Sequence, residues 1–466
     1  MINKLFSFFL GLILVQQLLV QTGCAHIVPP EGGKRDTIPP IPVKSSPKDS
    51  VLNFSGNKIT IEFNEFIELD NPFENVILSP NPTKQAQVES RLKTLTVKLK
   101  DSLLPNTTYS IDFGKTIKDI NEGNVLRDFK FIFSTGNTLD TKELSGKVIL
   151  AETRKADSTM MVTLYKKTDD SAVAKLKPFY YIRLKGDGSF RFTNLPAGIF
   201  AVYALKDING NKQYDQKTEL FAFLNEPVNI TDTTKPVLLY AYAEEKDLPK
   251  ITTQITTGGK PEKKLQLITN LENNRQSLLQ PLEISFSKPL KYFDSSKVSF
   301  IDSSKQAVTN YRWIKDSTNK KITLQYNWQP GMPYKIIALK DFAADTLGNQ
   351  LTKNDTFQFV AKREEDYGSL RLKFNNLNKE RNPVLQFVQQ DKVVKAVIIS
   401  DAVWFEKLVN PGEYELRVLF DDNKNGVWDP GKFFGVHKQP EKVLPIEIKI
   451  TIKPNWENEN TIDLKE

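Results

Sequence analysis

The chain has 466 residues, 39% hydrophobic and 26% charged, with a formal net charge of +8 and a single cysteine. Domains average roughly 150 residues, so this length predicts about three or more folded domains. The lone cysteine excludes disulfide-stapled modules. The positive charge is scattered and no basic-aromatic module occurs, so we expect no nucleic-acid partner.

Residues 1–24 have the layout of a secretory signal. Lys4 precedes an apolar run, and Gly23 supplies the small residue before Cys24. The segment resembles the lipobox cleaved by the lipoprotein signal peptidase, although Gln21 stands where leucine is usual. This resemblance implies a signal peptide over residues 1–23 and lipidation of Cys24. An ordinary cleaved signal and an uncleaved helix are the alternatives, but the apolar run is short for a bilayer span of about 20 residues.

Residues 24–42 predict a flexible stalk, because Pro29-Pro30, Gly32-Gly33 and Pro39-Pro40 interrupt any regular structure. Residues 43–136 then alternate apolar and polar side chains with a period of two, as in Ile59, Ile61 and Phe63. This period is typical of strands with one buried face. Three segments, "ITIEFNEFI", "LLPNTTYSIDF" and "DINEGNVLRDFKFIFST", resemble the bacterial Ig-like domains of surface-layer and surface-anchored proteins, which implies an Ig-like β-sandwich.

Residues 142–242 predict a second β-rich module. The run "GDGSFRFTNLPAGIFAVYAL", which begins at Gly186, resembles the transthyretin-like or carboxypeptidase regulatory-like β-sandwich. Residues 244–263, rich in Thr and charged residues, are typical of a linker.

The remainder of the chain repeats the sequence pattern of the first half. Residues 264–362 repeat the first module, and residues 366–453 repeat the second at an offset of 214, which places Asp421 on Asp207. A repeat at constant offset indicates duplication. We therefore predict an all-β chain of tandem β-sandwiches, named A, B, A′ and B′ in chain order. Residues 454–466 remain as a C-terminal tail.

Two Asp/Asn-rich loops carry the only predicted ligand chemistry. Oxygen side chains recur at loop positions 1, 3, 5 and 9, and position 7 supplies a backbone carbonyl, which is a spacing that Ca²⁺ uses. Neither loop has a glutamate at position 12, and Asn and Asp also close turns without an ion. A structural calcium site and a self-bonded turn both remain open. The candidate ligands are Asp207, Asn209, Asn211, Gln213 and Asp215, and Asp421, Asn423, Asn425, Val427 and Asp429.

We predict no catalytic residue and no enzyme activity. The chain has two histidines, His26 and His437, neither of them in a nucleophile or metal motif. A group of aromatic residues either belongs to the core, which is the default at strand positions, or forms a sugar platform. These residues include Phe179, Tyr180, Tyr181, Trp313, Trp404 and Trp428.

The stalk pattern resembles that of Ig-like-domain lipoproteins of Bacteroidota-type bacteria. The resemblance implies a protein anchored by lipid to the outer membrane, on the cell-surface side, acting as a scaffold or binding protein. An accessory role in an outer-membrane barrel complex for secretion or assembly is the leading hypothesis. A glycan-binding or adhesive lipoprotein is the alternative, and a β-sandwich hydrolase a remote one.

Overall fold

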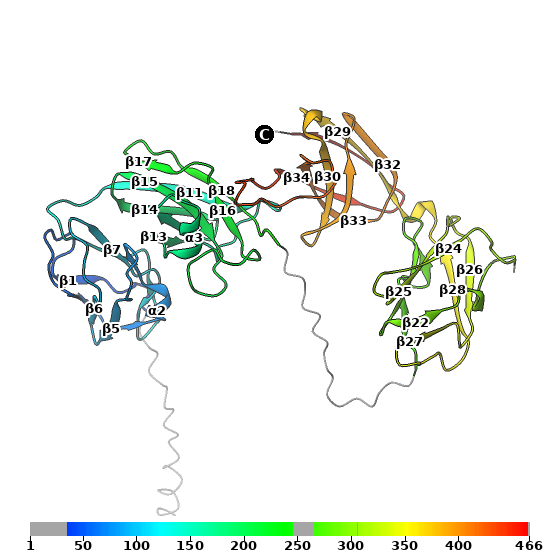
Figure 1. The fold of residues 1–466 in the computed structure, drawn as a ribbon, viewed down its shortest axis with the longest axis horizontal. Coiled ribbons are helices and arrows are strands. Elements are labelled where there is room, and N and C mark those ends of the chain that lie inside the picture. Colours follow the sequence, from blue (N-terminus) through cyan, green and yellow to red (C-terminus); the bar gives the residue numbers. More distant parts are fainter. Residues whose placement is uncertain (1–34, 246–263, 305, 465–466) are drawn as a thin grey trace, which may run out of the picture. The chain divides into compact units, whose positions relative to one another are not determined.

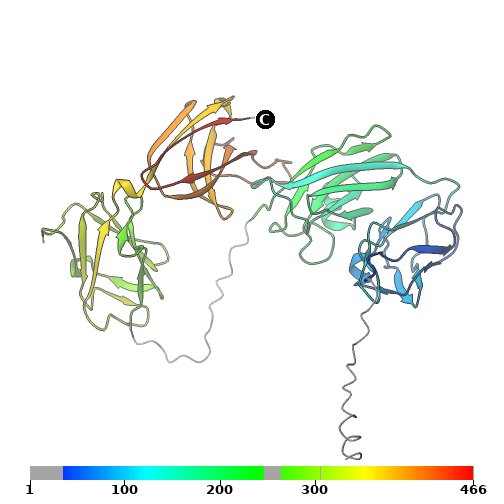
Figure 2. The same ribbon diagram turned by 180° about the vertical axis from the view of Figure 1, so that it is seen from behind.

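The computed structural model describes residues 35–245, 264–304 and 306–464 (Figures 1 and 2). The predicted signal peptide, Cys24, most of the stalk and most of the linker lie outside the described residues. The described chain is nearly all β and consists of tandem β-sandwiches, which confirms the predicted fold class. It divides into two compact units, Met1–Asp140 and Thr141–Glu466. Within the described part, no helix is both long and apolar enough to cross a bilayer.

Module A makes up the first unit. Its sheets have the orders β1-β2-β6-β5, β10-β7-β4 and β3-β8-β9. Ile59, Ile61 and Phe63 are buried together in its core, because alternate side chains on β2 point to the same face. The elements are β1 (Pro42–Ser46), β2 (Lys58–Phe63), β3 (Ile67–Leu69), α2 (Pro72–Asn75), β4 (Ile77–Ser79), β5 (Gln87–Arg91), β6 (Thr94–Lys98), β7 (Thr108–Asp112), β8 (Ile117–Asp119), β9 (Val125–Leu126) and β10 (Lys130–Ser134).

The end of the predicted stalk belongs to module A. The Asn124 side-chain amide donates to the carbonyl of Asp36 at 3.1 Å, and the N–H of Ile41 donates to the Asn64 side chain at 2.7 Å. Strand β1 begins at Pro42, one residue before the predicted boundary at residue 43, and the contacts of Asp36 and Ile41 extend the module several residues further toward the N-terminus.

Module B has two sheets, β14-β11-β18 and β13-β12-β15-β16, and β17 also pairs with β15. The β11–β18 pairing is parallel. Leu144, Val162 and Val202 lie in the buried core between the sheets. The elements are β11 (Lys142–Leu150), β12 (Met161–Tyr165), α3 (Ser171–Lys175), β13 (Tyr180–Arg183), β14 (Ser189–Leu195), β15 (Gly198–Leu205), β16 (Phe221–Phe223), β17 (Val228–Ile230) and β18 (Val237–Ala241).

Module A′ has sheets of order β19-β21-β25-β24, β20-β28-β26-β23 and β22-β27. Its core is rich in aromatic rings, including Phe300, Trp328 and Tyr334. The elements are β19 (Leu267–Thr269), β20 (Arg275–Gln276), β21 (Leu282–Phe286), β22 (Leu290–Phe293), η1 (Ser295–Lys297), β23 (Val298–Asp302), β24 (Arg312–Lys315), β25 (Lys321–Gln325), β26 (Pro333–Ala338), β27 (Ala343–Asp345), β28 (Asp355–Ala361) and η2 (Glu364–Asp366).

Module B′ has the sheets β32-β29-β35 and β31-β30-β33-β34, and its β29–β35 pairing is parallel, like β11–β18. Because β35 lies within residues 454–466, this segment supplies a strand of the module rather than a tail. The elements are β29 (Gly368–Asn375), η3 (Lys379–Arg381), β30 (Pro383–Gln389), β31 (Lys392–Ile398), β32 (Val403–Val409), β33 (Gly412–Phe420), β34 (Val443–Ile452) and β35 (Glu457–Asp463).

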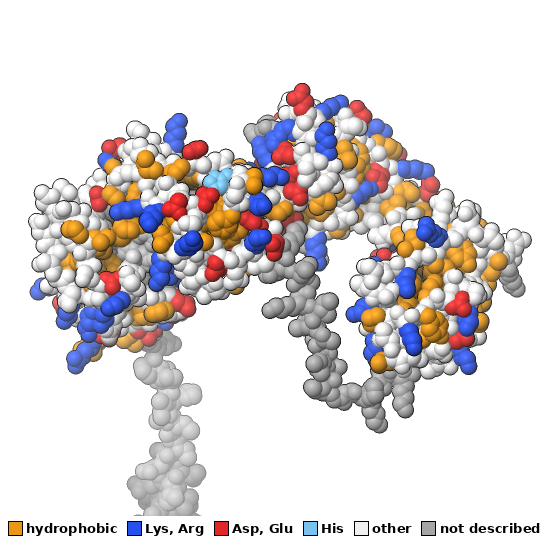
Figure 3. Space-filling model, viewed as in Figure 1, with side chains coloured by type: hydrophobic (Ala, Val, Ile, Leu, Met, Phe, Trp, Pro, Cys, Tyr) orange, Lys and Arg blue, Asp and Glu red, His pale blue; other side chains and the backbone are white. Residues whose placement is uncertain are grey.

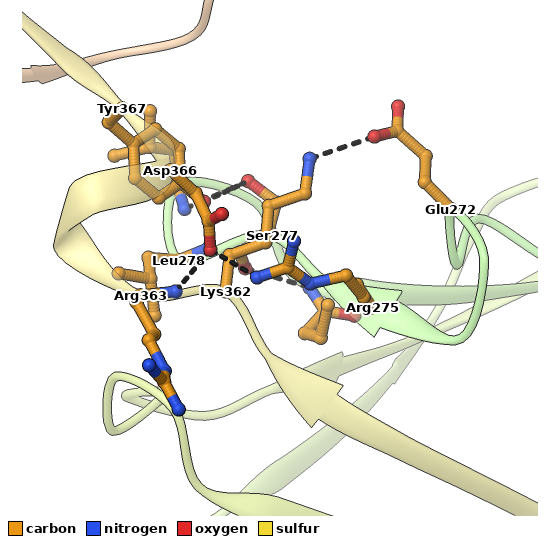
Figure 4. Close-up of polar contacts among 10 residues, drawn as sticks. Glu272, Arg275, Ser277, Leu278, Lys362, Arg363, Asp366 and Tyr367 are labelled. Carbon is orange, nitrogen blue, oxygen red and sulfur yellow. Dashed lines mark hydrogen bonds and ion pairs between the residues drawn. The ribbon is translucent and has the colours of Figure 1, made fainter. Parts of the chain in front are cut away.

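A short polar junction joins A′ to B′ (Figure 4). The hydroxyl of Tyr367, at the start of B′, accepts the N–H of Leu278 at 2.7 Å and lies 3.1 Å from the Ser277 hydroxyl. Asp366 forms an ion pair with Arg275 and also accepts the N–H of Arg363 at 2.7 Å. These contacts hold Asp366 and Tyr367, which directly precede β29, against residues 275–278 of A′.

Charged side chains are mixed over the surface. On the face drawn in Figure 3, Lys and Arg are interspersed with Asp and Glu. Many of the lysines pair with carboxylates on neighbouring strands, as Lys98 does with Glu89 at 3.3 Å. Exposed ion pairs of this kind contribute about 0–1 kcal/mol each to stability, as is typical of a solvated protein surface.

Candidate functional site

The two Asp/Asn loops occupy equivalent places in modules B and B′. Residues 207–215 follow β15 and lead toward β16, and residues 421–429 follow β33 and lead toward β34. Each loop therefore begins directly after a long buried strand, which fixes the position of its first aspartate.

In module B the loop is organised by Asp207. Its carboxylate accepts the backbone N–H groups of Gly210, Asn211 and Lys212 at 2.8, 3.1 and 2.8 Å. The side-chain amides of Asn209 and Asn211 donate to Asp215 at 3.2 and 2.7 Å. Loop positions 3, 5 and 9 thus converge on one point.

The amide oxygens of the same loop face its backbone. Asn209 Oδ1 accepts the N–H of Asn211 at 3.1 Å, and Asn211 Oδ1 accepts the N–H of Gln213 at 2.7 Å. These bonds fix which end of each amide points toward Asp215. Gln213 takes part through its backbone, as predicted for position 7, but the group that is engaged is its N–H.

Module B′ repeats this arrangement. Asp421 accepts the N–H groups of Asn425 at 3.2 Å and Gly426 at 2.6 Å. The amides of Asn423 and Asn425 donate to Asp429, the second at 2.9 Å. Asn425 Oδ1 accepts the N–H of Val427 at 2.7 Å. The two loops therefore bring together the same four side-chain positions, and the bonds differ in that Asp207 accepts a third backbone N–H, from Gly210.

Each loop also has a buried glutamate that was not among the predicted ligands. Glu219 is fully buried and accepts the N–H groups of Ile208 at 3.1 Å and Gln216 at 3.4 Å. Glu441, 2% exposed, accepts those of Asp422 and Asp429, both at 2.9 Å. Each carboxylate ties the beginning of its loop to the end.

Desolvation raises the pKa of both glutamates, and the nearby loop aspartates raise it further, while the backbone hydrogen bonds oppose the shift. Glu219 lies one residue past the expected position 12, so a tolerance of one residue would have found it. Glu441 lies beyond residues 430–440, where module B has only residues 216–218, and no local spacing points to it. We call residues 430–440 the insertion.

The loops offer oxygen donors of the type that hard cations take. Among the described residues, however, no three or more His, Cys, Asp or Glu side chains form a group that could hold a metal. In each loop the partners of the second aspartate are asparagine amides. A cation that entered would take the place of those two N–H donors.

The insertion of residues 430–440 carries the second prominent feature, a contact between B and B′. Phe433 is 1% exposed, and its ring lies 5.5 Å from Tyr203, 5.0 Å from Phe221 and 5.1 Å from Phe223, all in module B. Its N–H donates to Glu244 at 3.0 Å. The insertion therefore fills a place in the buried cluster of another module.

Further bonds surround this ring. His437 pairs with Asp170 at 2.8 Å, and the Gln439 amide donates to the Phe223 carbonyl at 3.1 Å. A cavity of 280 Å³ lies beside the contact, between Tyr240 and Leu224 of module B and Pro440 of B′. The contact thus combines an aromatic centre with polar bonds.

Most of the aromatic residues considered for a sugar platform are used in packing. Tyr180 and Trp428 are buried in core clusters, and Phe179, Trp313 and Trp404 are partly buried against theirs. Trp428 also donates to the Glu441 carbonyl at 3.0 Å. These side chains therefore stabilise the modules by packing in their cores.

Module A resembles a known domain family. Residues 36–135 match the bacterial Ig-like domain. The matched span includes residues 36–41, which agrees with their contacts to the Ig-like module. No curated protein matches the chain.

Several solved structures resemble the chain at low identity. The Bacillus anthracis TIE protein is 12% identical over 94% of this chain and 76% of that chain, with a TM-score of 0.17. BcpA, the major pilin subunit of Bacillus cereus, is 13% identical over 70% and 99%, with a TM-score of 0.16. The N-terminal part of the bacterial S-layer protein SbsC is 16% identical over 35% and 41%, with a TM-score of 0.15. TM-scores this low carry no argument about function.

Proposed function

We propose that the chain is a lipid-anchored, non-catalytic scaffold on the cell-surface side of the outer membrane, and that it serves as an accessory subunit of a barrel complex for secretion or assembly. Acylated Cys24 would hold the chain at the membrane, since two or more acyl chains anchor a protein stably where one does not. The A-B-A′-B′ duplication is part of this proposal.

The contact between B and B′ is the observation that supports a scaffold best. These modules are separated in sequence by all of A′, yet Phe433 of B′ lies among three rings of B. A buried contact of this kind fixes two modules together, whereas modules joined only by linkers move independently. A rigid body is suited to positioning a partner. The contacts of three titratable groups support a non-catalytic role. The buried Glu219 and Glu441 accept backbone N–H groups within their loops, and His437 pairs with Asp170.

Cross-linking in native membranes tests the proposed role. We expect a barrel protein to co-purify with the wild-type chain, and its recovery to fall when Cys24→Ser removes the acylation site. Recovery of soluble periplasmic proteins alone would contradict the proposal. Retention of a polysaccharide in place of a protein would favour the adhesive alternative.

For that alternative, two exposed rings are the sites to test. Phe405 is 51% exposed with Arg371 over its ring, and Trp456 is 58% exposed with Lys453 over its ring. If Phe405→Ala and Trp456→Ala together abolish binding to cell-surface polysaccharide, the adhesive function is favoured over the scaffold function.

We also propose that the two Asp/Asn loops take up calcium as a structural ion. The convergence of positions 3, 5 and 9 on one point in both loops favours this. Asp207, Asn209, Asn211 and Asp215 would hold the ion in one loop, and Asp421, Asn423, Asn425 and Asp429 in the other. A bound Ca²⁺ would supply positive charge at the second aspartate and stiffen the loop.

A further inference from the structure

One end of module A carries apolar side chains on separate loops. Ile38, Ile41, Phe66, Leu92 and Ile120 are all exposed, by 57%, 52%, 47%, 66% and 51%. We call these five residues the tether-end patch, because the described part of the chain begins at Arg35, whose guanidinium donates to the carbonyl of Glu122, two residues from Ile120, at 3.3 Å.

Backbone hydrogen bonds place these residues at the same end of the module. The N–H of Ile67 donates to the Leu92 carbonyl at 3.0 Å, and the N–H of Ile120 donates to the Phe66 carbonyl at 3.3 Å. Ile41 and Ile38 join this end through their contacts with Asn64 and Asn124.

Module A′ builds the same turns with other side chains. There the N–H of Leu290 donates to the Asn319 carbonyl at 2.7 Å, and the N–H of Thr346 donates to the Pro289 carbonyl at 3.0 Å. Pro289, Asn319 and Thr346 thus stand where module A has Phe66, Leu92 and Ile120. Because A′ forms these turns without the three apolar side chains, the fold does not require them.

Leu92 is also unfavourable for its backbone. Its φ is 55°, and that of Asn319 is 56°. Asparagine is tolerated in this left-handed region, whereas a branched apolar residue is strained there. Module A therefore keeps an exposed leucine at the cost of stability. Module A′ also exposes a leucine at this end, Leu347. The two modules therefore differ in that module A gathers several exposed apolar side chains there.

The charges around the patch are mixed. Lys93 Nζ donates to the Asn64 carbonyl at 2.7 Å and lies 5.4 Å from the centre of the Phe66 ring. Glu65 and Glu122 lie close by. Burial raises the pKa of the Glu65 carboxyl, and the charges of Asp119 and Glu122 add to this shift. The N–H of Glu122 donates to Asp119 at 2.6 Å. Attraction of the patch to another surface would thus come from burial of apolar area rather than from net charge.

The short distance in sequence between Cys24 and module A suggests which surface covers this patch. Eleven residues lead from Cys24 to Arg35, and eleven extended residues span at most about 40 Å. If Cys24 is acylated, as the proposed function requires, the patch is held within that distance of the membrane. The chain that enters A′ at the equivalent end carries no cysteine.

We propose that the tether-end patch inserts into the lipid interface and seats module A on the membrane. This proposal rests on the proposed lipid anchor. Apolar loop tips that reach the headgroup boundary are stabilised in proportion to the area that they bury. Lys93 can lie beside Phe66 with its ammonium group at the headgroup level, as long basic side chains do at interfaces.

The test uses the mature chain with Cys24→Ser, so that no acyl chain contributes, and vesicles of phosphatidylcholine and phosphatidylethanolamine. We expect the chain to bind these vesicles, and we expect Leu92→Asn with Ile120→Thr to weaken binding at least about tenfold. Both replacements install the residues that A′ uses in the same turns, so the fold is retained. Adding phosphatidylglycerol or salt should change the binding little.

A matched control adds Asn319→Leu and Thr346→Ile to the weakened variant. The same side chains on A′ should not restore binding. Restoration there, equal binding by the weakened variant, or no vesicle binding at all would overturn the proposal. Self-association that disappears in the weakened variant, without vesicle binding, would assign the patch to a second copy and also overturn it. Failure of fatty-acid labelling of the native chain would overturn the anchor, whatever the vesicles show.

Discussion

Replacing Phe433 with alanine removes the ring at the centre of the contact between B and B′. The side chain is 1% exposed and lies 5.0–5.5 Å, centre to centre, from three rings of module B. Core replacements of Phe by Ala cost about 3–5 kcal/mol. Because all three rings belong to module B, we expect this cost to fall on the contact.

Calorimetry of the mature chain measures this cost. For a unit of about 200 residues, it corresponds to a fall in the transition midpoint on the order of 10 °C. Val436→Ala is the matched control, because Val436 lies in the same insertion but is 66% exposed. It should change stability by less than about 0.5 kcal/mol. Equal shifts for the two variants would refute the idea that the insertion joins the modules.

Three further predictions concern the loops. Asp207→Ala removes the acceptor of the Gly210 and Lys212 N–H groups and one of the two acceptors of the Asn211 N–H. It should destabilise module B by about 2–4 kcal/mol in urea unfolding, whereas the exposed Asp422→Ala should have little effect. Millimolar CaCl₂ should raise the transition midpoint, and Asp215→Asn with Asp429→Asn should remove the increase; an unchanged midpoint in calcium and in chelator would contradict a calcium site. Burial raises the folded-state pKa of Glu441 above its usual 4.5, so the stability contributed by its protonated form is complete below that pH and is lost as the pH rises through the folded pKa. In chelator, the stability of Glu441→Gln should therefore improve relative to wild type as the pH rises from about 4.5, and a constant difference would contradict this.

Alternating strands were the part of the fold most accessible to sequence reasoning. Ile59, Ile61 and Phe63 alternate with polar residues, and burial of one face makes that period visible. The strand β35 gave no such signal. Only Ile462 is buried within Glu457–Asp463, so the segment has the composition of a tail although it completes a sheet.

The candidate loops could be located from the sequence, but their hydrogen bonds could not. Asp, Asn and Gly at fixed spacing predict a turn or an ion site equally well, since both place the same oxygen atoms around one point. Glu441 was missed because eleven residues separate it from Asp429, whereas three separate Glu219 from Asp215. The role of Phe433 was missed because a local pattern does not reveal which module an aromatic side chain contacts.

The tether-end patch has a signal in the sequence, namely apolar residues at turn positions. Phe66, Leu92 and Ile120 lie in turns, where apolar residues are unusual, and the repeat places polar or small side chains at the same points. Comparison of the two copies position by position would have marked all three. Their exposure, however, needed the structure.

Metabolic labelling with a fatty acid tests the central claim of a lipid-anchored scaffold most directly. We predict that the wild-type chain incorporates the label and fractionates with the outer membrane, and that Cys24→Ser abolishes incorporation. A wild-type chain without label, or a Cys24→Ser chain labelled equally, would contradict the anchor on which the proposed function depends.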